Sequence, residues 1–143
     1  MHVRHTLPHG PNAPCEAREA IEALTAGRVS EGALSELRLV VSELVTNAIR
    51  HGRDRRGAVD LALSLRDGVV RVEVIDGGSG FEVPAEPPEP GEPGGWGLVV
   101  VDQLAVRWGV EGGHATRVWA EVALDGFGAS GGGTTERVYA RNV

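Results

Sequence analysis

Glu43 and Asn47 are the first residues in this sequence whose types and spacing could do chemistry. On a helix, side chains at this spacing lie side by side, about 6 Å apart along the axis at ~1.5 Å rise per residue. Both present oxygen atoms, which suit a hard cation such as Mg²⁺ or a water molecule to be activated. A solvated polar helix face is the alternative interpretation of the same pattern.

Asp76 is a second candidate, because it ends an alternating apolar segment and is followed by Gly-Gly-Ser-Gly. Glycines at this point let a planar ligand approach the backbone closely. A carboxylate that accepts a hydrogen bond from an exocyclic amine selects adenine over guanine, whose carbonyl would face it as a second acceptor. The alternative is a tight turn in which aspartate is an ordinary turn residue.

A second glycine cluster, Gly94-Gly95-Trp96-Gly97, leads into an apolar segment that starts at Leu98. If that segment is a helix, its exposed N–H groups and its dipole favour an anion; a flexible hinge before a helix is the alternative. All fourteen basic residues are arginine. The chain therefore has no Walker-type phosphate loop and no lysine Schiff-base chemistry. Bound phosphates would have to be neutralised by backbone N–H groups, arginine or a metal ion.

Two helices and two hairpins are expected to position these residues. An apolar repeat of three and four predicts a long helix from a Ser30 N-cap to His51, and a shorter helix is predicted over 14–26. Alternating apolar residues predict one hairpin over 58–76, turned at an Asp-Gly pair, and another over 107–122. Further elements are expected at residues 3–7, as an edge strand, and at residues 98–105, as a helix.

The order of these elements predicts an α+β fold of two layers. Tight turns between strands imply a mostly antiparallel sheet, with the helices on one face. Residues 82–94 hold five prolines and four glutamates, a composition that cannot bury a core, so a mobile loop is expected there. The predicted organisation is one domain over 1–124 and a glycine-rich flexible tail over 125–143.

Bulk composition narrows the function classes. The net charge of −6 argues against nucleic acid and anionic membranes as partners. The single cysteine, Cys15, cannot form an internal disulfide. No apolar run approaches the length of a membrane span, and the N-terminus lacks an apolar signal core, so a cytoplasmic protein is expected.

The three polar stretches occur in one order: Glu43-x-x-x-Asn47, then Asp76-x-Gly78-x-Gly80, then Gly95-x-Gly97-Leu98. This resembles the N, G1 and G2 boxes of the GHKL superfamily, the histidine-kinase-like ATPases. The glutamate before the asparagine and the histidine at position 51 are similar to the anti-sigma-factor serine/threonine-protein kinase branch. The resemblance runs from about residue 7 to residue 122 and implies the Bergerat ATP-binding fold.

The resemblance also implies roles for individual residues. Asn47 would ligate the Mg²⁺ that bridges the phosphates of ATP, and Glu43 would be the general base for the attacking hydroxyl. Asp76 would accept from the adenine amino group. The remaining nucleotide-binding positions that the resemblance implies are Arg50, Gly78, Gly80, Gly95, Trp96, Gly97, Leu98 and Thr116. His51 is expected to pack at the helix end.

As an activity, the resemblance implies an ATP-dependent serine kinase that is also an anti-sigma factor. Its partners would be a sigma factor and an anti-anti-sigma protein with a STAS domain, and the branch implies a possible homodimer. Two departures favour a second hypothesis, a non-catalytic module gated by ATP: Trp96 stands where many relatives carry a basic residue, and the segment 82–94 is acidic and lacks arginine. A two-component histidine kinase fragment fits less well, because no histidine lies in a long helical hairpin.

Overall fold

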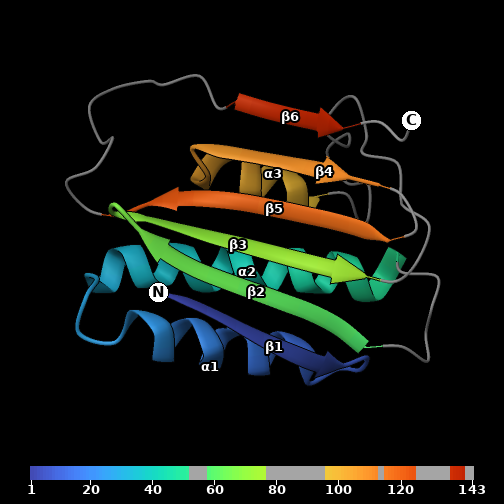
Figure 1. Cartoon of the computed structure of the whole chain (residues 1–143), viewed down its shortest axis with the longest axis horizontal. Coiled ribbons are helices and arrows are strands. Elements are labelled where there is room, and N and C mark those ends of the chain that lie inside the picture. The colour runs from blue at the N-terminus through green and yellow to red at the C-terminus, as the bar shows by residue number, and fades with distance from the viewer. Residues whose placement is uncertain (52–57, 77–95, 113–114, 125–135, 141–143) are drawn as a thin grey trace.

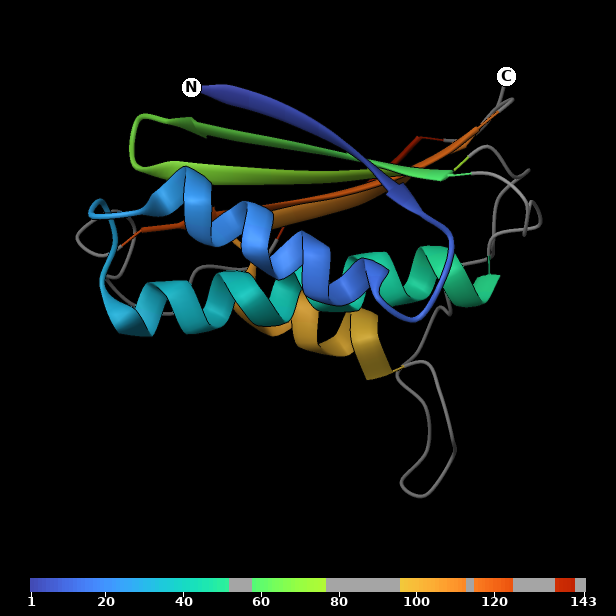
Figure 2. The same cartoon turned by 90° about the horizontal axis from the view of Figure 1, so that it is seen from below.

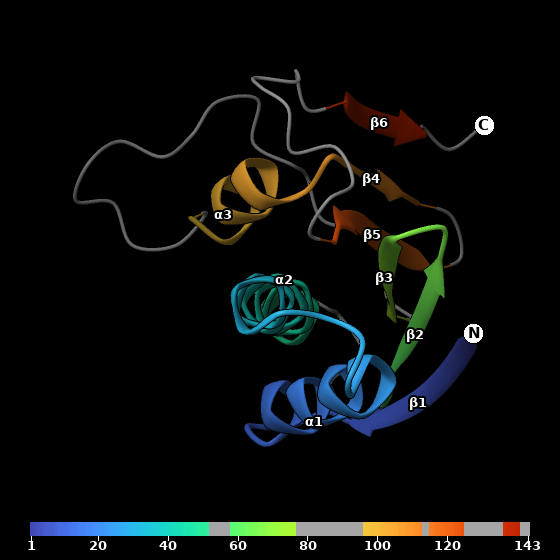
Figure 3. The ribbon, with the colours of Figure 1, turned by 90° about the vertical axis from the view of Figure 1, so that its left-hand side faces the viewer.

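The computed structural model describes residues 1–51, 58–76, 96–112, 115–124 and 136–140, with the backbone alone at His51, Trp96, Gly97 and 136–140. In this part of the chain a twisted sheet forms one layer and the helices form a second layer on one of its faces (Figure 2, Figure 3). The elements in chain order are β1 (His2–Pro8), α1 (Ala13–Thr25), α2 (Glu31–His51), β2 (Ala58–Arg66), β3 (Val69–Asp76), α3 (Trp96–Leu104), β4 (Arg107–Glu111), β5 (Thr116–Ala123) and β6 (Glu136–Ala140).

The strand order across the sheet is β1-β2-β3-β5-β4-β6 (Figure 1). Every pairing is antiparallel except that of β4 with β6, which is parallel. The predicted two-layer α+β fold, with a mostly antiparallel sheet and helices on one face, is therefore confirmed. No helix in the described ranges is both long enough and apolar enough to cross a membrane.

The long central helix α2 forms where its apolar stripe and cap predicted it. The Oγ of Ser30 accepts a hydrogen bond from the backbone N–H of Ala33 at 3.1 Å, which caps the N-terminus. Leu37, Val41 and Leu44 are fully buried against the sheet and the neighbouring helices. Burial of this stripe fixes the rotation of α2 about its axis, so the polar positions between the apolar ones are fixed as well.

The first hairpin, β2–β3, ends at Asp76. Asp67 and Gly68 have φ of 50° and 74°, the left-handed conformations that a two-residue type I′ turn requires. This turn sets the register that pairs Val59 with Asp76. Because side chains alternate along a strand, Asp76 lies on the same face as the buried Val72 and Val74, toward the helices.

Helix α3 forms although it contains three consecutive valines, which have low helix propensity. Leu98 and Val101 are buried in the main apolar core, and α3 packs mainly against α2. Tertiary burial therefore outweighs local propensity in this segment. The predicted helix is confirmed, with a start at Trp96 rather than at Leu98.

The two tryptophans of the second hairpin lie on opposite faces of the sheet. Trp108 pairs with Ala120 and faces the helices, where it is part of the core. Trp119 pairs with Gly109 and lies on the other face, under the guanidinium of Arg71, whose Cζ is 4.1 Å from the ring centroid. Both side chains are buried, and they do not pair with each other across the strands.

The C-terminal part of the chain differs from expectation. Residues 136–140 form the strand β6, which pairs with β4 from Arg107 to Glu111. A flexible tail over the whole of 125–143 is therefore too broad a prediction. A five-residue strand after a glycine-rich stretch gives too short an alternation to detect, and its partner lies about 30 positions earlier in the chain, a pairing that local patterns do not encode.

We expect truncation of the α2 stripe to destabilise the fold. Leu44 is fully buried, so Leu44→Ala should lower the free energy of unfolding by about 2–5 kcal/mol through lost burial and an unfilled cavity. Leu39 lies on the same helix and is 43% exposed, so Leu39→Ala should change it by less than about 1 kcal/mol. Urea unfolding of the two variants checks this, and equal losses would contradict the assigned orientation of α2.

Candidate nucleotide-binding site

Four elements bring their polar ends to one end of the sheet. In Figure 1, at the right-hand side, β3 ends, β5 begins and α2 ends, and α3 starts at the same end before running back toward the beginning of β4. These are the elements that carry the residues predicted to bind a nucleotide. Helix α2 packs against both β3 and β5, so elements that are far apart in the chain adjoin at this site.

Asp76 and Thr116 are directly opposite each other in the antiparallel pair β3–β5. Both lie on the helix-facing side, with 6% and 5% of their surface exposed. Thr25 is the other buried polar residue in the described part of the chain, and its hydroxyl is hydrogen-bonded to the carbonyl of Ile21 inside α1. A carboxylate and a hydroxyl placed together in an apolar layer need polar partners, because burying them costs free energy otherwise.

The register of β3 with β5 makes Thr116 the residue opposite Asp76. Neither side chain is without an interaction partner in the protein. Together they offer a carboxylate acceptor and a hydroxyl that can both donate and accept. This combination can recognise a base that presents an exocyclic amine, directly or through a bridging water.

Glu43 and Asn47 lie on α2 at the boundary between its buried stripe and solvent. Both are half-buried, whereas the adjacent Leu44 and Ala48 are buried in the core. This partial exposure lets their oxygen atoms reach a ligand while the helix holds their position. Arg50 is exposed at the end of the same helix, so it fits the expected place near phosphate or solvent.

The glycine clusters belong mainly to segments outside the described residues. This applies to Gly78, Gly80 and Gly95, and to the acidic segment 82–94 that was predicted to be a mobile loop. Trp96 and Gly97 are the first two residues of α3, and Leu98 is buried after them. The prediction that a helix follows the second glycine cluster is confirmed. Figure 1 shows that the N-terminus of α3 lies at the same end of the sheet as the end of β3, which is Asp76.

The residues present fit a magnesium ion that is coordinated mainly by nucleotide phosphates and water. In the described ranges there is no group of three or more His, Cys, Asp or Glu side chains arranged to hold a metal. Mg²⁺ commonly takes only one or two protein ligands when phosphates and waters supply the others. The amide oxygen of Asn47 is suited to such a site.

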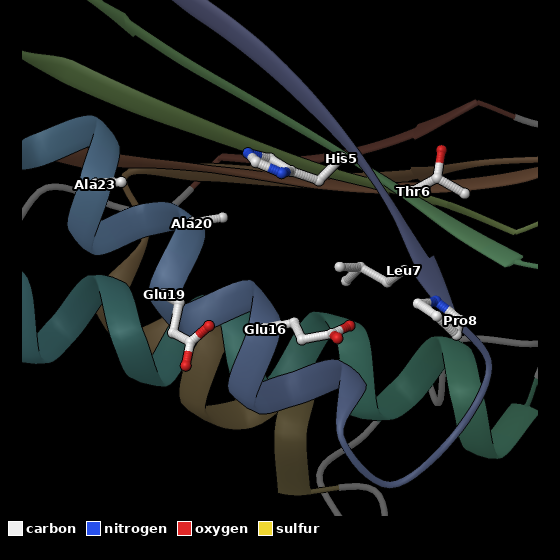
Figure 4. A pocket seen from close by; sticks show the side chains of 8 residues that line it. All are labelled: His5, Thr6, Leu7, Pro8, Glu16, Glu19, Ala20 and Ala23. Atoms are coloured by element: carbon white, nitrogen blue, oxygen red, sulfur yellow. The ribbon is translucent and has the colours of Figure 1, made fainter.

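A groove of about 400 Å³ lies elsewhere, between the edge strand β1 and helix α1 (Figure 4). It is lined by His5, Thr6, Leu7, Pro8, Glu16, Glu19, Ala20 and Ala23. Strand β2 separates β1 from β3, so this groove is distinct from the end of β3 where Asp76 lies. Sequence analysis did not predict it, because it depends on how α1 packs beside the edge strand.

Comparison with known proteins gives the family. Residues 8–121 match the model of the histidine kinase-like ATPase domain. The chain belongs to this family. The match covers both helices of the N-terminal half and the strands from β2 to most of β5, so it includes Glu43, Asn47, Asp76 and Thr116. Recognition of the GHKL superfamily from the three boxes is thereby confirmed, and nucleotide binding is the property that an ATPase domain of this family implies.

Curated relatives agree with the branch. The chain is 48% identical over 50 residues to the anti-sigma F factor of Geobacillus stearothermophilus, which is 34% of each protein. It is 37% identical over 51 residues to the anti-sigma F factor of Clostridium botulinum strain Eklund 17B, which is 34% of this chain and 36% of that protein. The chain thus spans about a third of the length of these relatives. They support its membership of a family of anti-sigma factors and ATPases.

Removal of the proposed metal ligand should weaken nucleotide binding. We expect Asn47→Ala to lower the affinity for ATP in the presence of Mg²⁺ by roughly 10–100-fold, the loss for one interaction with a charged group. Asn12→Ala is the matched control, because Asn12 is exposed and makes no side-chain capping hydrogen bond. Fluorescence titration with ATP, with and without Mg²⁺, checks this. An unchanged Mg²⁺-dependent affinity would remove Asn47 from the site.

Proposed function

We propose that this ATPase-family chain binds Mg²⁺-ATP and transfers its γ-phosphoryl group to a serine of a partner protein. The observation that supports this proposal is the buried Asp76–Thr116 pair on the helix-facing side of the sheet, together with the half-buried Glu43 and Asn47 of α2, a helix that packs against β3 and β5. The Asp76–Thr116 pair can select the base, and Glu43 and Asn47 can act at the phosphates. Both are positioned by rigid elements of the fold, as a preorganised site requires.

In the proposed reaction the serine hydroxyl attacks the γ-phosphorus in line with the bridging oxygen of ADP. The new P–O bond forms as the bond to ADP breaks, and the hydroxyl proton passes to the carboxylate of Glu43. A bound Mg²⁺ would neutralise charge on the phosphate oxygens. Asn47 would orient that ion, and the N–H groups at the start of α3 would stabilise phosphate oxygens.

We further propose that the phosphoacceptor is an anti-anti-sigma protein of the STAS type and that a sigma factor is the competing partner. The support is the local identity to proteins named anti-sigma F factor. A homodimer and a cytoplasmic location are part of the same proposal. The net charge of −6 favours protein partners over nucleic acid and anionic membranes.

The second candidate function is an ATP-gated binding module without turnover. The observation that favours it is the segment 82–94, which has four glutamates and no arginine. Negative charge beside a triphosphate opposes its capture and supplies no cation for the transition state. In this alternative, ATP would change the affinity for a partner protein and would stay intact.

A phosphotransfer assay separates the two candidates. The chain is incubated with γ-labelled ATP, Mg²⁺ and STAS-domain proteins, and the label on protein is located by mass spectrometry of phosphoserine. The kinase proposal predicts label on a single serine of one partner. ATP binding with a change in partner affinity but no label on any partner would select the gated module. Absence of ATP binding would overturn both.

A further inference from the structure

A partly buried hydrogen bond joins helix α3 to the neighbouring strand β4. The indole Nε1 of Trp108 donates to Oδ1 of Asp102 at 2.8 Å. Trp108 is 2% exposed and belongs to the core, and Asp102 is half-buried near the C-terminal end of α3. The bond therefore links the short helix after the second glycine cluster to the sheet by a directional contact.

Asp102 is unfavourable at its position in α3 for local reasons. Aspartate has low helix propensity, and a carboxylate near a helix C-terminus is opposed by the helix dipole. The last turn of α3 holds no basic residue to compensate. A residue with such low local preference is explained by a tertiary contact, and the hydrogen bond from Trp108 is such a contact.

The helix needs such a contact to be held in one position. It has nine residues, fewer than an isolated helix needs to be stable in water. Burial of Leu98 and Val101 fixes which face of α3 meets the core, but it restricts small shifts along the helix axis less than a directional contact does. A hydrogen bond of fixed length and angle restricts these shifts.

We propose that Asp102 and Trp108 are positioning residues that set where the N-terminus of α3 stands relative to Asp76. The inference rests on the proposed function, in which the N–H groups of that N-terminus contact the phosphates. A small displacement of the helix lengthens those hydrogen bonds and weakens phosphate binding. The base-binding end, on β3 and β5, is not displaced, because it belongs to the sheet.

The chain provides a matched pair of tryptophans to test this. Trp119 is also buried, at 3% exposed, but its Nε1 has no hydrogen-bond partner among the residues that the structure describes. Trp108→Phe and Trp119→Phe therefore make the same change in side-chain volume, and only the first removes a hydrogen bond. Asp102→Asn is a third variant, because its amide oxygen can still accept from the indole.

Affinities for ATP and for adenosine are measured for the three variants and the wild type by competition with a fluorescent ATP analogue. We expect Trp108→Phe to lower the ATP affinity about tenfold, the effect of one lost hydrogen bond, while the adenosine affinity stays within about twofold. Trp119→Phe should change neither, and Asp102→Asn should retain most of the ATP affinity.

Other outcomes overturn the inference. Equal ATP affinities for Trp108→Phe and Trp119→Phe would show that the bond does not position the phosphate end. Equal losses for ATP and adenosine in Trp108→Phe would show a general structural effect. If Trp108→Phe does not fold, Asp102→Leu replaces it with the same expectations. A wild type that binds no ATP contradicts the proposed function itself, whereas failure confined to the variants contradicts only this inference.

Discussion

Glu43→Gln should bind Mg²⁺-ATP as the wild type does and should transfer phosphate about 10²–10⁴ times more slowly. The substitution keeps the shape of the side chain but removes its ability to accept the serine proton. Glu43 is half-buried on α2, one turn from Asn47, so the glutamine remains in place when the charge is lost. Single-turnover phosphotransfer to the partner serine, together with ATP titration, separates the chemical step from binding.

Glu36→Gln is the matched control for this variant. Glu36 is exposed on the same helix, so the change in net charge is identical and the site is untouched. It should transfer phosphate at the wild-type rate. If the Glu43→Gln rate equals that of Glu36→Gln, Glu43 is not the base, and the gated-module alternative gains support when ATP binding is retained.

Asp76→Asn should lower the affinity for ATP about 100-fold and remove most of the preference for ATP over GTP. The carboxylate only accepts hydrogen bonds, which matches the adenine amine and opposes the guanine carbonyl. An asparagine amide donates as well as accepts, so the discrimination is lost. When a buried site that is built to pair with a polar group loses that pairing, the binding free energy falls by several kcal/mol. A 100-fold loss of affinity corresponds to roughly 3 kcal/mol.

Asp60→Asn controls for the change of charge in the same sheet. Asp60 is exposed on β2, where its carboxylate accepts a hydrogen bond from the Thr6 hydroxyl at 2.9 Å. An asparagine oxygen can still accept that bond. Isothermal titrations with ATP and GTP should leave this variant unchanged. If both variants keep the wild-type preference for ATP, then Asp76 does not contact the base.

Much of the fold could be predicted because local patterns and tertiary structure agree. The apolar stripe of α2, its Ser30 cap and the Asp67-Gly68 turn each have a physical reason that does not depend on distant residues. The same patterns placed Glu43 and Asn47 on one polar helix face and Asp76 at a strand end. The sequence also indicated a helix after the second glycine cluster.

Contacts between distant elements could not be predicted in the same way. The opposition of Asp76 and Thr116 depends on the register of β3 with β5, which spans 40 residues of chain. The strand β6 and the hydrogen bond from Trp108 to Asp102 likewise depend on packing. Aspartate near the end of a helix was a signal for the latter, since the helix alone disfavours it.

The proposed function requires this chain to hold a purine triphosphate between the α2 flank, the ends of β3 and β5, and the start of α3. Isothermal titration of the wild-type chain with ATP in Mg²⁺ buffer, followed by the same titration with GTP, tests it most directly. We expect saturable heat of binding for ATP, at one molecule per chain, and much weaker binding of GTP. No heat with ATP, or equal affinities for the two nucleotides, would contradict it.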